Sequence, residues 1–233
     1  MGNPIKQLAG ETAIYGLSTI LARIINFFFV PIYTRLLTTE SYGVVTEFMA
    51  YIAVLQVLLV FGMETGCFRF ANKEGVNPNS VYSNALASVF GVNALFLAAM
   101  FLFAGPLASA MGYAGYESCF IYMGGILFFD SITAILFARL RQEHKALKFA
   151  LIKTAKILTE TGANLMLFFW FPSYCLKVAE RVGKTVSELT SSDVWMLNFV
   201  SATPDFSYVI FAILLSCILC ALLFLPDFLK FTY

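Results

Sequence analysis

The sequence predicts an all-α integral membrane protein, and three observations carry this prediction. Hydrophobic residues make up 60% of the 233 residues and charged residues only 12%, whereas a soluble domain is about half apolar and about a quarter charged. Apolar segments of about 20 residues, the length that a helix needs to cross a bilayer, recur along the chain. Short polar connections separate them, so each segment is expected to be one membrane-spanning helix.

The first three expected helices lie at about 12–33, 44–66 and 80–104. The first is too long for the core of a signal peptide and lacks a clean cleavage site, so it is expected to remain as a helix. A polar turn, 37–43, precedes the second, and a stretch rich in Asn and Gly, 72–79, precedes the third. Gly105 and Pro106 are expected to end the third helix, because proline donates no backbone hydrogen bond.

The last three expected helices lie at about 119–138, 150–171 and 206–225. A basic connector, 139–148, joins the first two of these, and Pro172 opens one long polar segment, 172–205. The run Thr203-Pro204-Asp205 then starts the last helix with a capping residue, a proline and an acid in order. We therefore expect six transmembrane helices that form a single unit over 1–233.

Lys and Arg residues predict the orientation, because cytoplasmic loops carry an excess of them. Most of the loop cations, counting Lys6 and Lys230, fall on the N-terminal side of the membrane, and the connector 139–148 holds the largest group. Both termini are therefore expected in the cytoplasm, with the segment 172–205 outside.

Several ionisable side chains fall inside the expected helices, where a charge is costly and usually faces a cavity or another helix. At about 1.5 Å per residue, Arg23 lies about 16 Å into the first helix, near the membrane midplane. Asp130 reaches a similar depth from the other side, so the two are candidates to pair. Glu47, Glu64 and Lys153 lie near helix ends and are expected to extend to the membrane surface.

The helix expected at 150–171 carries a polar stripe. Its members recur at spacings of three and four residues, which puts them on one helix face: Lys153, Lys156, Glu160 and Asn164. On the first helix, Asn26 lies one turn from Arg23. Because both signs of charge are represented, we expect a hydrophilic cavity between helices; the alternative is a purely structural buried network. Arg and Lys in the inner half of such a cavity would attract an anion, such as a phosphate headgroup.

The residue types argue against several other classes of function. The chain has one His, and none of its Cys residues has metal-ligand spacing. There is no nucleophile–base pattern and no Gly-rich phosphate loop. A net charge of +1 gives no reason to expect a nucleic-acid partner. We therefore expect no enzyme activity, no cofactor, no metal site and no ATP hydrolysis by this chain.

Residues 10–70 resemble the opening of a known family. Arg23, then Pro31, then Thr34-Arg35-Leu36-Leu37, then an acidic turn that ends in Tyr42-Gly43 follow its pattern. The family is that of the Wzx-type O-antigen and capsule flippases, which are polysaccharide-biosynthesis members of the multidrug/oligosaccharidyl-lipid/polysaccharide exporter superfamily. The later run Phe61-Gly62-Met63-Glu64 is also similar to that family's end of helix 2, and residues 225–230 are similar to the exit from its helix 6.

The resemblance implies an exporter that moves a polyprenyl-diphosphate-linked oligosaccharide to the outer leaflet for surface polysaccharide such as lipopolysaccharide O-antigen. It implies alternating access around a cationic cavity, in the bacterial cytoplasmic (inner) membrane, with membrane lipid, a coupling ion (H+ or Na+) and polysaccharide assembly proteins as further partners. Arg23 and Arg35 match arginines of the family's first-helix pattern by position, whereas Lys156 is a cavity candidate from its stripe alone. The full set of expected cavity residues is Arg23, Asn26, Arg35, Asp130, Lys156, Glu160 and Asn164.

The family is built of two similar lobes, and this sequence supplies the helices of one, with the second lobe absent. We therefore expect a fragment of a longer transporter or a half-transporter that dimerises. Two other functions stay open. One is a drug/cation antiporter of the same superfamily, which would favour acidic cavity residues such as Asp130 and Glu160. The other is a non-transporting membrane scaffold.

Overall fold

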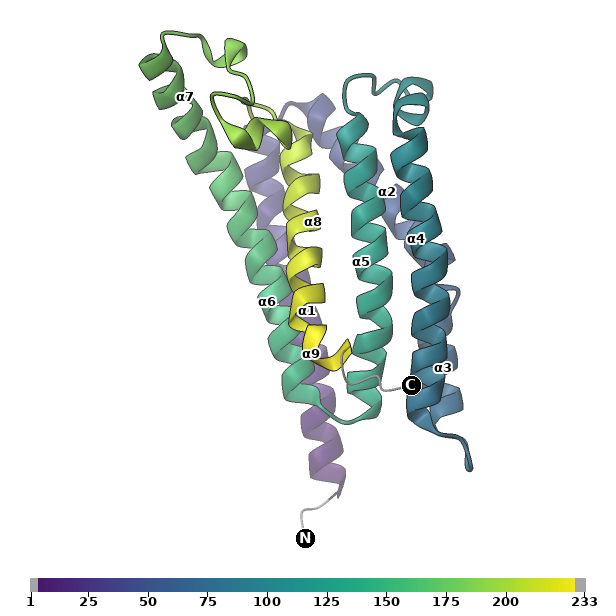
Figure 1. Cartoon of the computed structure of the whole chain (residues 1–233). Coiled ribbons are helices and arrows are strands. Elements are labelled where there is room, and N and C mark those ends of the chain that lie inside the picture. The colour runs from purple at the N-terminus through teal and green to yellow at the C-terminus, as the bar shows by residue number, and fades with distance from the viewer. Residues whose placement is uncertain (1–3, 229–233) are drawn as a thin grey trace.

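The regular structure of the chain is helical wherever the computed structural model describes it, which is residues 4–228, with side chains from residue 9 onward (Figure 1). This confirms the all-α prediction. Lys6 and Lys230, which entered the orientation argument, lie outside the described side chains. The elements in order are α1 (Pro4–Leu36), α2 (Thr39–Val60), α3 (Met63–Ala71), α4 (Pro78–Ala110), α5 (Glu117–Gln142), α6 (Ala146–Leu165), the π-helix η1 (Met166–Trp170), α7 (Phe171–Val182), the 3₁₀ turns η2 (Val186–Glu188) and η3 (Trp195–Asn198), α8 (Phe206–Leu223) and α9 (Leu225–Phe228).

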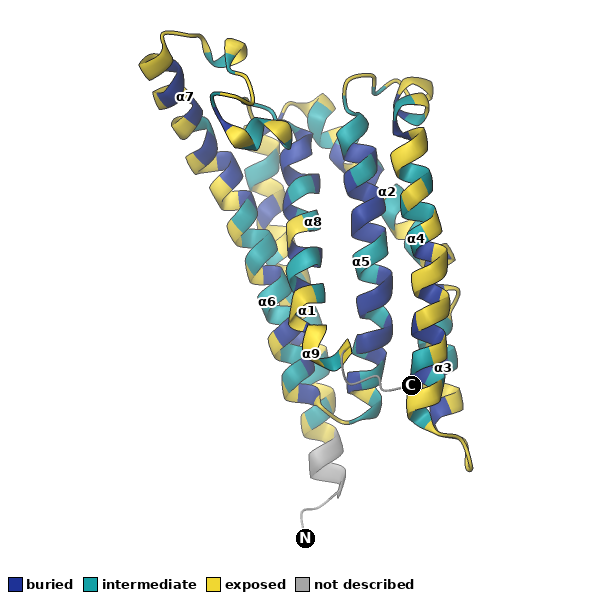
Figure 2. Ribbon diagram, viewed as in Figure 1, coloured by how far each residue is buried: buried dark blue, intermediate teal, exposed yellow. Residues whose placement is uncertain are grey.

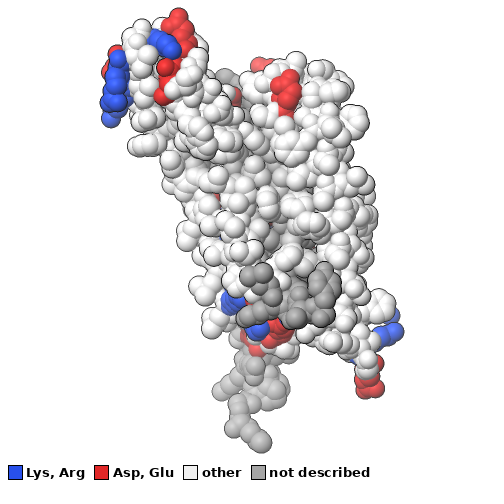
Figure 3. Space-filling model, in the orientation of Figure 1, with Lys and Arg blue, Asp and Glu red and all other residues white. Residues whose placement is uncertain are grey.

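Within the described part of the chain, five helical stretches are long and apolar enough to cross a membrane: Ala9–Leu36, Thr39–Ala71, Pro78–Ala110, Glu117–Gln142 and Phe206–Leu223. The remaining expected span, 150–171, falls mainly in α6 and η1; α6 packs beside α1 and α8 but carries too many charges to qualify by composition. On the face shown in Figure 3, charged side chains gather at the two ends of the molecule and leave a nearly uncharged band between them. The chain is therefore a multi-pass membrane protein.

The helices run up and down, so that α1 begins and α9 ends at the same end of the molecule, which we call the proximal end (Figure 1). The opposite, distal end carries α7 and the irregular segment 183–205. Helix α5 lies at the centre, packed against α4, α8, α2 and α3, and it is coloured as buried over most of its length in Figure 2. Its Gly124 and Gly125 allow this approach, because a Cβ at Gly124 would lie 2.9 Å from Met100 Cγ.

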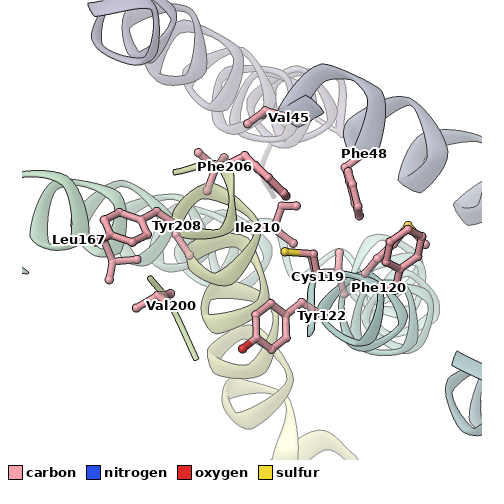
Figure 4. Packing of buried hydrophobic residues seen from close by; sticks show 14 of the residues in the cluster. Val45, Phe48, Cys119, Phe120, Tyr122, Leu167, Val200, Phe206, Tyr208 and Ile210 are labelled. Carbon is pink, nitrogen blue, oxygen red and sulfur yellow. The ribbon is translucent and has the colours of Figure 1, made fainter. Parts of the chain in front are cut away.

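Two apolar clusters fill the interior. The distal cluster is centred on Phe48 of α2, Phe120 of α5 and Phe206 of α8, whose rings converge in Figure 4. The Phe48 ring lies 5.2 Å from Phe120 and 6.1 Å from Phe206 between centroids. The proximal cluster includes Tyr82 of α4, Ile135 of α5, Phe149 of α6 and Phe224. Each cluster spans four or more elements, so close packing of apolar side chains holds both ends of the bundle together.

The expected continuous helix at 44–66 is wrong at one point. Phe61 and Gly62 both have left-handed backbone angles, with φ of 53° and 64°, and they separate α2 from α3. Asn93 of α4, which is fully buried, donates its Nδ2 to the carbonyl of Leu59 at 3.2 Å. This hydrogen bond satisfies the Leu59 carbonyl, which the break between the two helices would otherwise leave without a partner.

Two prolines that were expected to end helices do not. Helix α4 continues past Pro106 to Ala110. The long helix that starts with α6 passes through η1 and then through Pro172, which lies in the first turn of α7. A proline removes only one backbone donor, and the wider turn of a π-helix changes the hydrogen-bond ladder just where that donor is missing. The long segment expected at 172–205 is therefore helical up to Val182 and irregular only from Gly183 onward. Helix α8 starts at Phe206 as expected for the last helix, but the capping residue is Asp205, which accepts from Ser207 N at 2.8 Å, and not the expected Thr203.

Candidate functional site

A polar layer separates the distal cluster from the proximal cluster. On α5, Leu127 belongs to the distal cluster and Ile132 to the proximal one, and on α8 the same boundary falls between Cys217 and Cys220. Asp130 lies in the gap on α5. Ionisable groups at this level are far from both ends of the bundle, so they need partners within the protein or a cavity that holds water.

The centre of the layer is an ion pair between α6 and α5. Lys156 Nζ donates to Asp130 Oδ1, and the two side chains retain only 22% and 27% of their exposed surface. Cys217 on α8 also interacts with Asp130, so three helices meet at this carboxylate. Asp130 pairs with Lys156 rather than with Arg23, because α5 packs against α6, whereas α1 packs chiefly against α6.

Glu160 and Asn164 continue the stripe away from this ion pair. Glu160 lies one turn beyond Lys156 on α6, and no hydrogen bond or ion pair joins its carboxylate to any residue that the structure describes. Asn164 is 2% exposed and donates its Nδ2 to the Glu160 backbone carbonyl at 2.9 Å. Its side-chain oxygen is buried without a partner among the described residues. The stripe therefore offers two carboxyl or amide groups with unused acceptor capacity.

The cations nearer the proximal end lie between α6 and α1. Lys153 Nζ donates to Thr19 Oγ1 of α1 at 3.1 Å, so this lysine does not extend to the membrane surface as expected. Arg23 is exposed on α1 and lies within electrostatic range of Lys153. Asn26 and Arg35 are also exposed on α1, so the structure does not join them to the Asp130–Lys156 pair.

A pocket of about 390 Å³ opens at the proximal end, between α1, α3 and α5. Its charged lining consists of Glu64, which pairs with Arg141, and Glu11, whose Oε2 lies 2.8 Å from His144 Nδ1. Glu64, which was expected to extend to the membrane surface, is 39% exposed at this end and pairs with Arg141 of a neighbouring helix. Arg141 and Glu64 both lie within electrostatic range of Lys153. Arg141 and Glu64 therefore connect the lining of the pocket with Lys153 of the polar layer, and sequence reasoning missed the pocket because its lining comes from three separate segments, 11–15, 64–68 and 138–144.

The distal end is closed by tyrosines. Glu47 of α2 accepts a hydrogen bond from Tyr51 and another from Tyr113, the latter at 2.5 Å, so it is satisfied within the protein and does not extend outward as expected. In the irregular segment 183–205 that covers this end, hydrogen bonds from Lys184 and Thr190 lower the pKa of Asp193 to about 2.

An apolar groove of about 670 Å³ lies beneath the segment 183–205, between α6 and α8, with Trp195 and Phe199 over it. The sequence pattern gave no sign of this groove, because apolar residues there look the same as lipid-facing ones.

Comparison with models of known families gives one match, over residues 8–192, to the family described as polysaccharide biosynthesis protein. No curated protein and no solved structure matches the chain. The matched residues are most of the chain, so it belongs to the polysaccharide biosynthesis protein family, which is a Wzx-like flippase family. The resemblance identified in residues 10–70 is therefore confirmed.

Proposed function

We propose that this member of the polysaccharide biosynthesis protein family is one lobe of a flippase for polyprenyl-diphosphate-linked oligosaccharides. The lobe spans 1–233 with six transmembrane helices, including α6, and it acts by alternating access around a cationic cavity. In this proposal both termini face the cytoplasm and the membrane is the bacterial inner membrane. The chain then serves as a transporter for surface polysaccharide such as O-antigen, not as an enzyme, and it uses no cofactor.

The observation that carries this proposal is the line of cations from the proximal pocket to the middle of the bundle. Arg141 lines the pocket, Lys153 lies within electrostatic range of it, and Lys156 follows one turn later on α6. Arg23 approaches the same line from α1. A diphosphate must carry its negative charge through a low-dielectric region. Nearby cations lower the free-energy cost of that passage far more than they would in water. The line therefore supports a path for the headgroup from the proximal side.

The apolar groove between α6 and α8 supports a site for the hydrocarbon part of such a substrate. Its volume of about 670 Å³ is enclosed almost wholly by apolar side chains. A polyprenyl chain gains free energy from contact with apolar side chains chiefly by close packing, since the lipid around it is equally apolar. Membrane lipid is the competing occupant of this groove.

The exposed polar residues of α1 support the view that this face of the lobe lies against another protein surface and not against lipid. Arg23 and Asn26 are exposed between apolar side chains such as Phe27 and Phe28, which are 72% and 66% exposed. A charged group at that depth is costly in lipid, so another lobe or a second copy of the chain is the better neighbour. The cavity would then lie between the two, with Arg23 and Arg35 on its wall.

The experiment is complementation of surface polysaccharide in the native strain with the native gene deleted. We expect Arg23→Ala and Lys153→Ala to lose most of the polysaccharide, because each removes a cation from the proposed path. Lys177→Ala is the matched control, since Lys177 is exposed on α7 and away from the path. Variant levels in the membrane are measured alongside by immunoblot. Full polysaccharide from both path variants at wild-type levels would exclude the cationic path.

A drug/cation antiporter is the second candidate, because the Glu160 carboxylate has no partner among the described residues. This function predicts that deleting the gene sensitises cells to cationic drugs and leaves polysaccharide unchanged. A non-transporting scaffold predicts instead that the path variants and the control all complement equally.

A further inference from the structure

The Glu160 carboxylate lies in the polar layer without a hydrogen bond or ion pair to any described residue. The ionisable groups that face it come from every helix packed around it: Tyr33 on α1, Asp130 on α5, Lys156 on α6 and Cys217 on α8. Only Lys156 among these is a cation, and its ammonium is already bound to Asp130.

The charges of this group do not balance. The Asp130–Lys156 pair is neutral, so an ionised Glu160 leaves one negative charge in excess. The next cation on α6 is Lys153, seven residues back, which is about 10 Å along the helix axis, and it is bound to Thr19. A partly buried carboxylate without a counter-charge is unfavourable in a low-dielectric interior, and such a group normally binds a cation or a proton.

We propose that Glu160 is the binding site of a monovalent cation, a proton or Na+, and that Lys156 exchanges between Asp130 and Glu160 when this cation is released. Lys156 and Glu160 are four residues apart on one helix face, which is the spacing at which an ammonium and a carboxylate meet. The structure shows Lys156 bound to Asp130, and we assign the cation-bound form of Glu160 to this arrangement. When Lys156 turns to Glu160, the cation leaves and Asp130 is left to the thiol of Cys217.

Asn164 supplies an independent observation for this site. Its side chain is 2% exposed, its amide is anchored on the Glu160 carbonyl, and its side-chain oxygen has no partner among the described residues. An amide oxygen can accept a hydrogen bond from a protonated carboxyl or coordinate Na+ together with a carboxylate. Buried acceptors without a donor are rare, and a cation or proton held at Glu160 would give this oxygen a partner.

Cation binding at Glu160 stands on this geometry alone, whereas its coupling to substrate movement rests on the proposed flippase function. Two discrete partners for Lys156 give the layer two states, and the cation favours one of them. In each state one carboxylate is neutralised by the lysine, so the exchange links ion release to a change in how α5 and α6 are joined.

The test is labelling of the purified full chain in liposomes with dicyclohexylcarbodiimide, which attacks protonated carboxyls in apolar surroundings, followed by peptide mass spectrometry. We expect modification of Glu160 at acid pH that is lost at alkaline pH. Glu47 is the internal control, since two tyrosines occupy its oxygens. Protection by Na+ but not by choline at constant pH and ionic strength identifies a sodium site, and pH dependence without sodium protection identifies a proton site.

Two results would overturn the proposal: no modification of Glu160 beyond that of Glu47, or modification that neither pH nor Na+ changes. Glu160→Gln should remove the label while the protein still inserts and folds, which gel filtration checks. The readout does not need transport. If Arg23→Ala and Lys153→Ala support full polysaccharide while Glu160 labels as expected, the flippase function fails and the cation site stands. If both variants lose the polysaccharide as expected while Glu160 is not labelled, the cation site is excluded and the flippase function stands.

Discussion

The two ends of the bundle are closed by different kinds of contact. At the distal end, buried tyrosines bind carbonyls of the covering segment: Tyr122 donates to Phe199 O at 2.7 Å and Tyr208 to Ser201 O at 2.8 Å. At the proximal end the closing contacts are ion pairs between half-exposed side chains, such as Glu64 with Arg141. The hydroxyl of Tyr82, although buried, has no partner among the described residues.

This difference indicates which end opens more readily. Hydrogen bonds from buried tyrosines to backbone carbonyls leave an unsatisfied group behind when they break, which costs about 1–3 kcal/mol each. Exposed ion pairs contribute about 0–1 kcal/mol, because water and salt replace them easily. We infer that the proximal end is the easier to open, with the polar layer as the boundary between a firm half and a looser one. The following variants test that division.

The largest effect is expected at the boundary itself. Lys156→Met leaves Asp130 without its counter-charge, and breaking one partner of a buried pair costs about 3–5 kcal/mol. We expect a large fall in the thermal midpoint of the purified protein in detergent. The double variant Asp130→Asn with Lys156→Met should recover most of that loss, since no charge is then left unpaired. A single variant as stable as the wild type would mean that the boundary does not hold the halves together.

The next effect is expected in the firm half, where α5 meets α4. Gly124→Ala puts a methyl group 2.9 Å from Met100 Cγ and 3.0 Å from its Cβ, and neither atom is the free end of the side chain. Overpacking of this kind costs about 1–3 kcal/mol. Gly125→Ala should cost less, because its one close contact is the terminal Leu214 Cδ1. Gly91→Ala in α4, which meets nothing within 4 Å, is the control in the same unfolding assay. Equal midpoints for all three would show that this interface is loosely packed.

The sequence predicted the helices well and their interruptions poorly. Apolar length alone places a helix, because a backbone in lipid has few alternatives. The break at Phe61–Gly62 depends on Asn93 reaching across from α4, and no local pattern contains that information. The passage through Pro172 likewise depends on a π-turn formed by the residues before it.

The candidate site was predictable as a stripe but not as a set of pairs. The helical period correctly placed Lys156 and Glu160 on one face of α6. The partner of Asp130 was predicted from depth alone, and depth does not say which helices touch. Lys153 was left out of the expected cavity because it lies near a helix end, yet its ammonium donates a hydrogen bond to Thr19 of α1. Pairing between helices is set by packing, which hydropathy does not encode.

A smaller effect should separate the tyrosines of the two halves. Tyr122→Phe removes the hydroxyl that holds Phe199, and we expect a loss of about 1 kcal/mol. Segment 183–205 should then be cleaved faster by an added protease. Tyr82→Phe in the proximal cluster removes a hydroxyl without a partner among the described residues, so it should leave stability unchanged or raise it slightly. Equal losses from the two variants, measured by thermal unfolding, would contradict the division into firm and loose halves.

The smallest effect is expected at the proximal ion pairs, and native cysteines report it directly. Cys67 of α3 is 3% exposed in the proximal cluster, whereas Cys119 of α5 is fully buried in the distal one, and both are free thiols. Glu64→Gln removes the pair with Arg141 at a cost below about 1 kcal/mol, which still raises the population of open states several-fold. A variant that retains only Cys67 should therefore react faster with a membrane-permeant maleimide when Glu64 is Gln, and one that retains only Cys119 should not. Raising the ionic strength should speed the Cys67 reaction in the wild-type background, because screening shortens the reach of exposed charges, and should add little in the Glu64→Gln background. Equal acceleration at both cysteines would mean that the bundle loosens as one unit, and the polar layer would then mark no boundary.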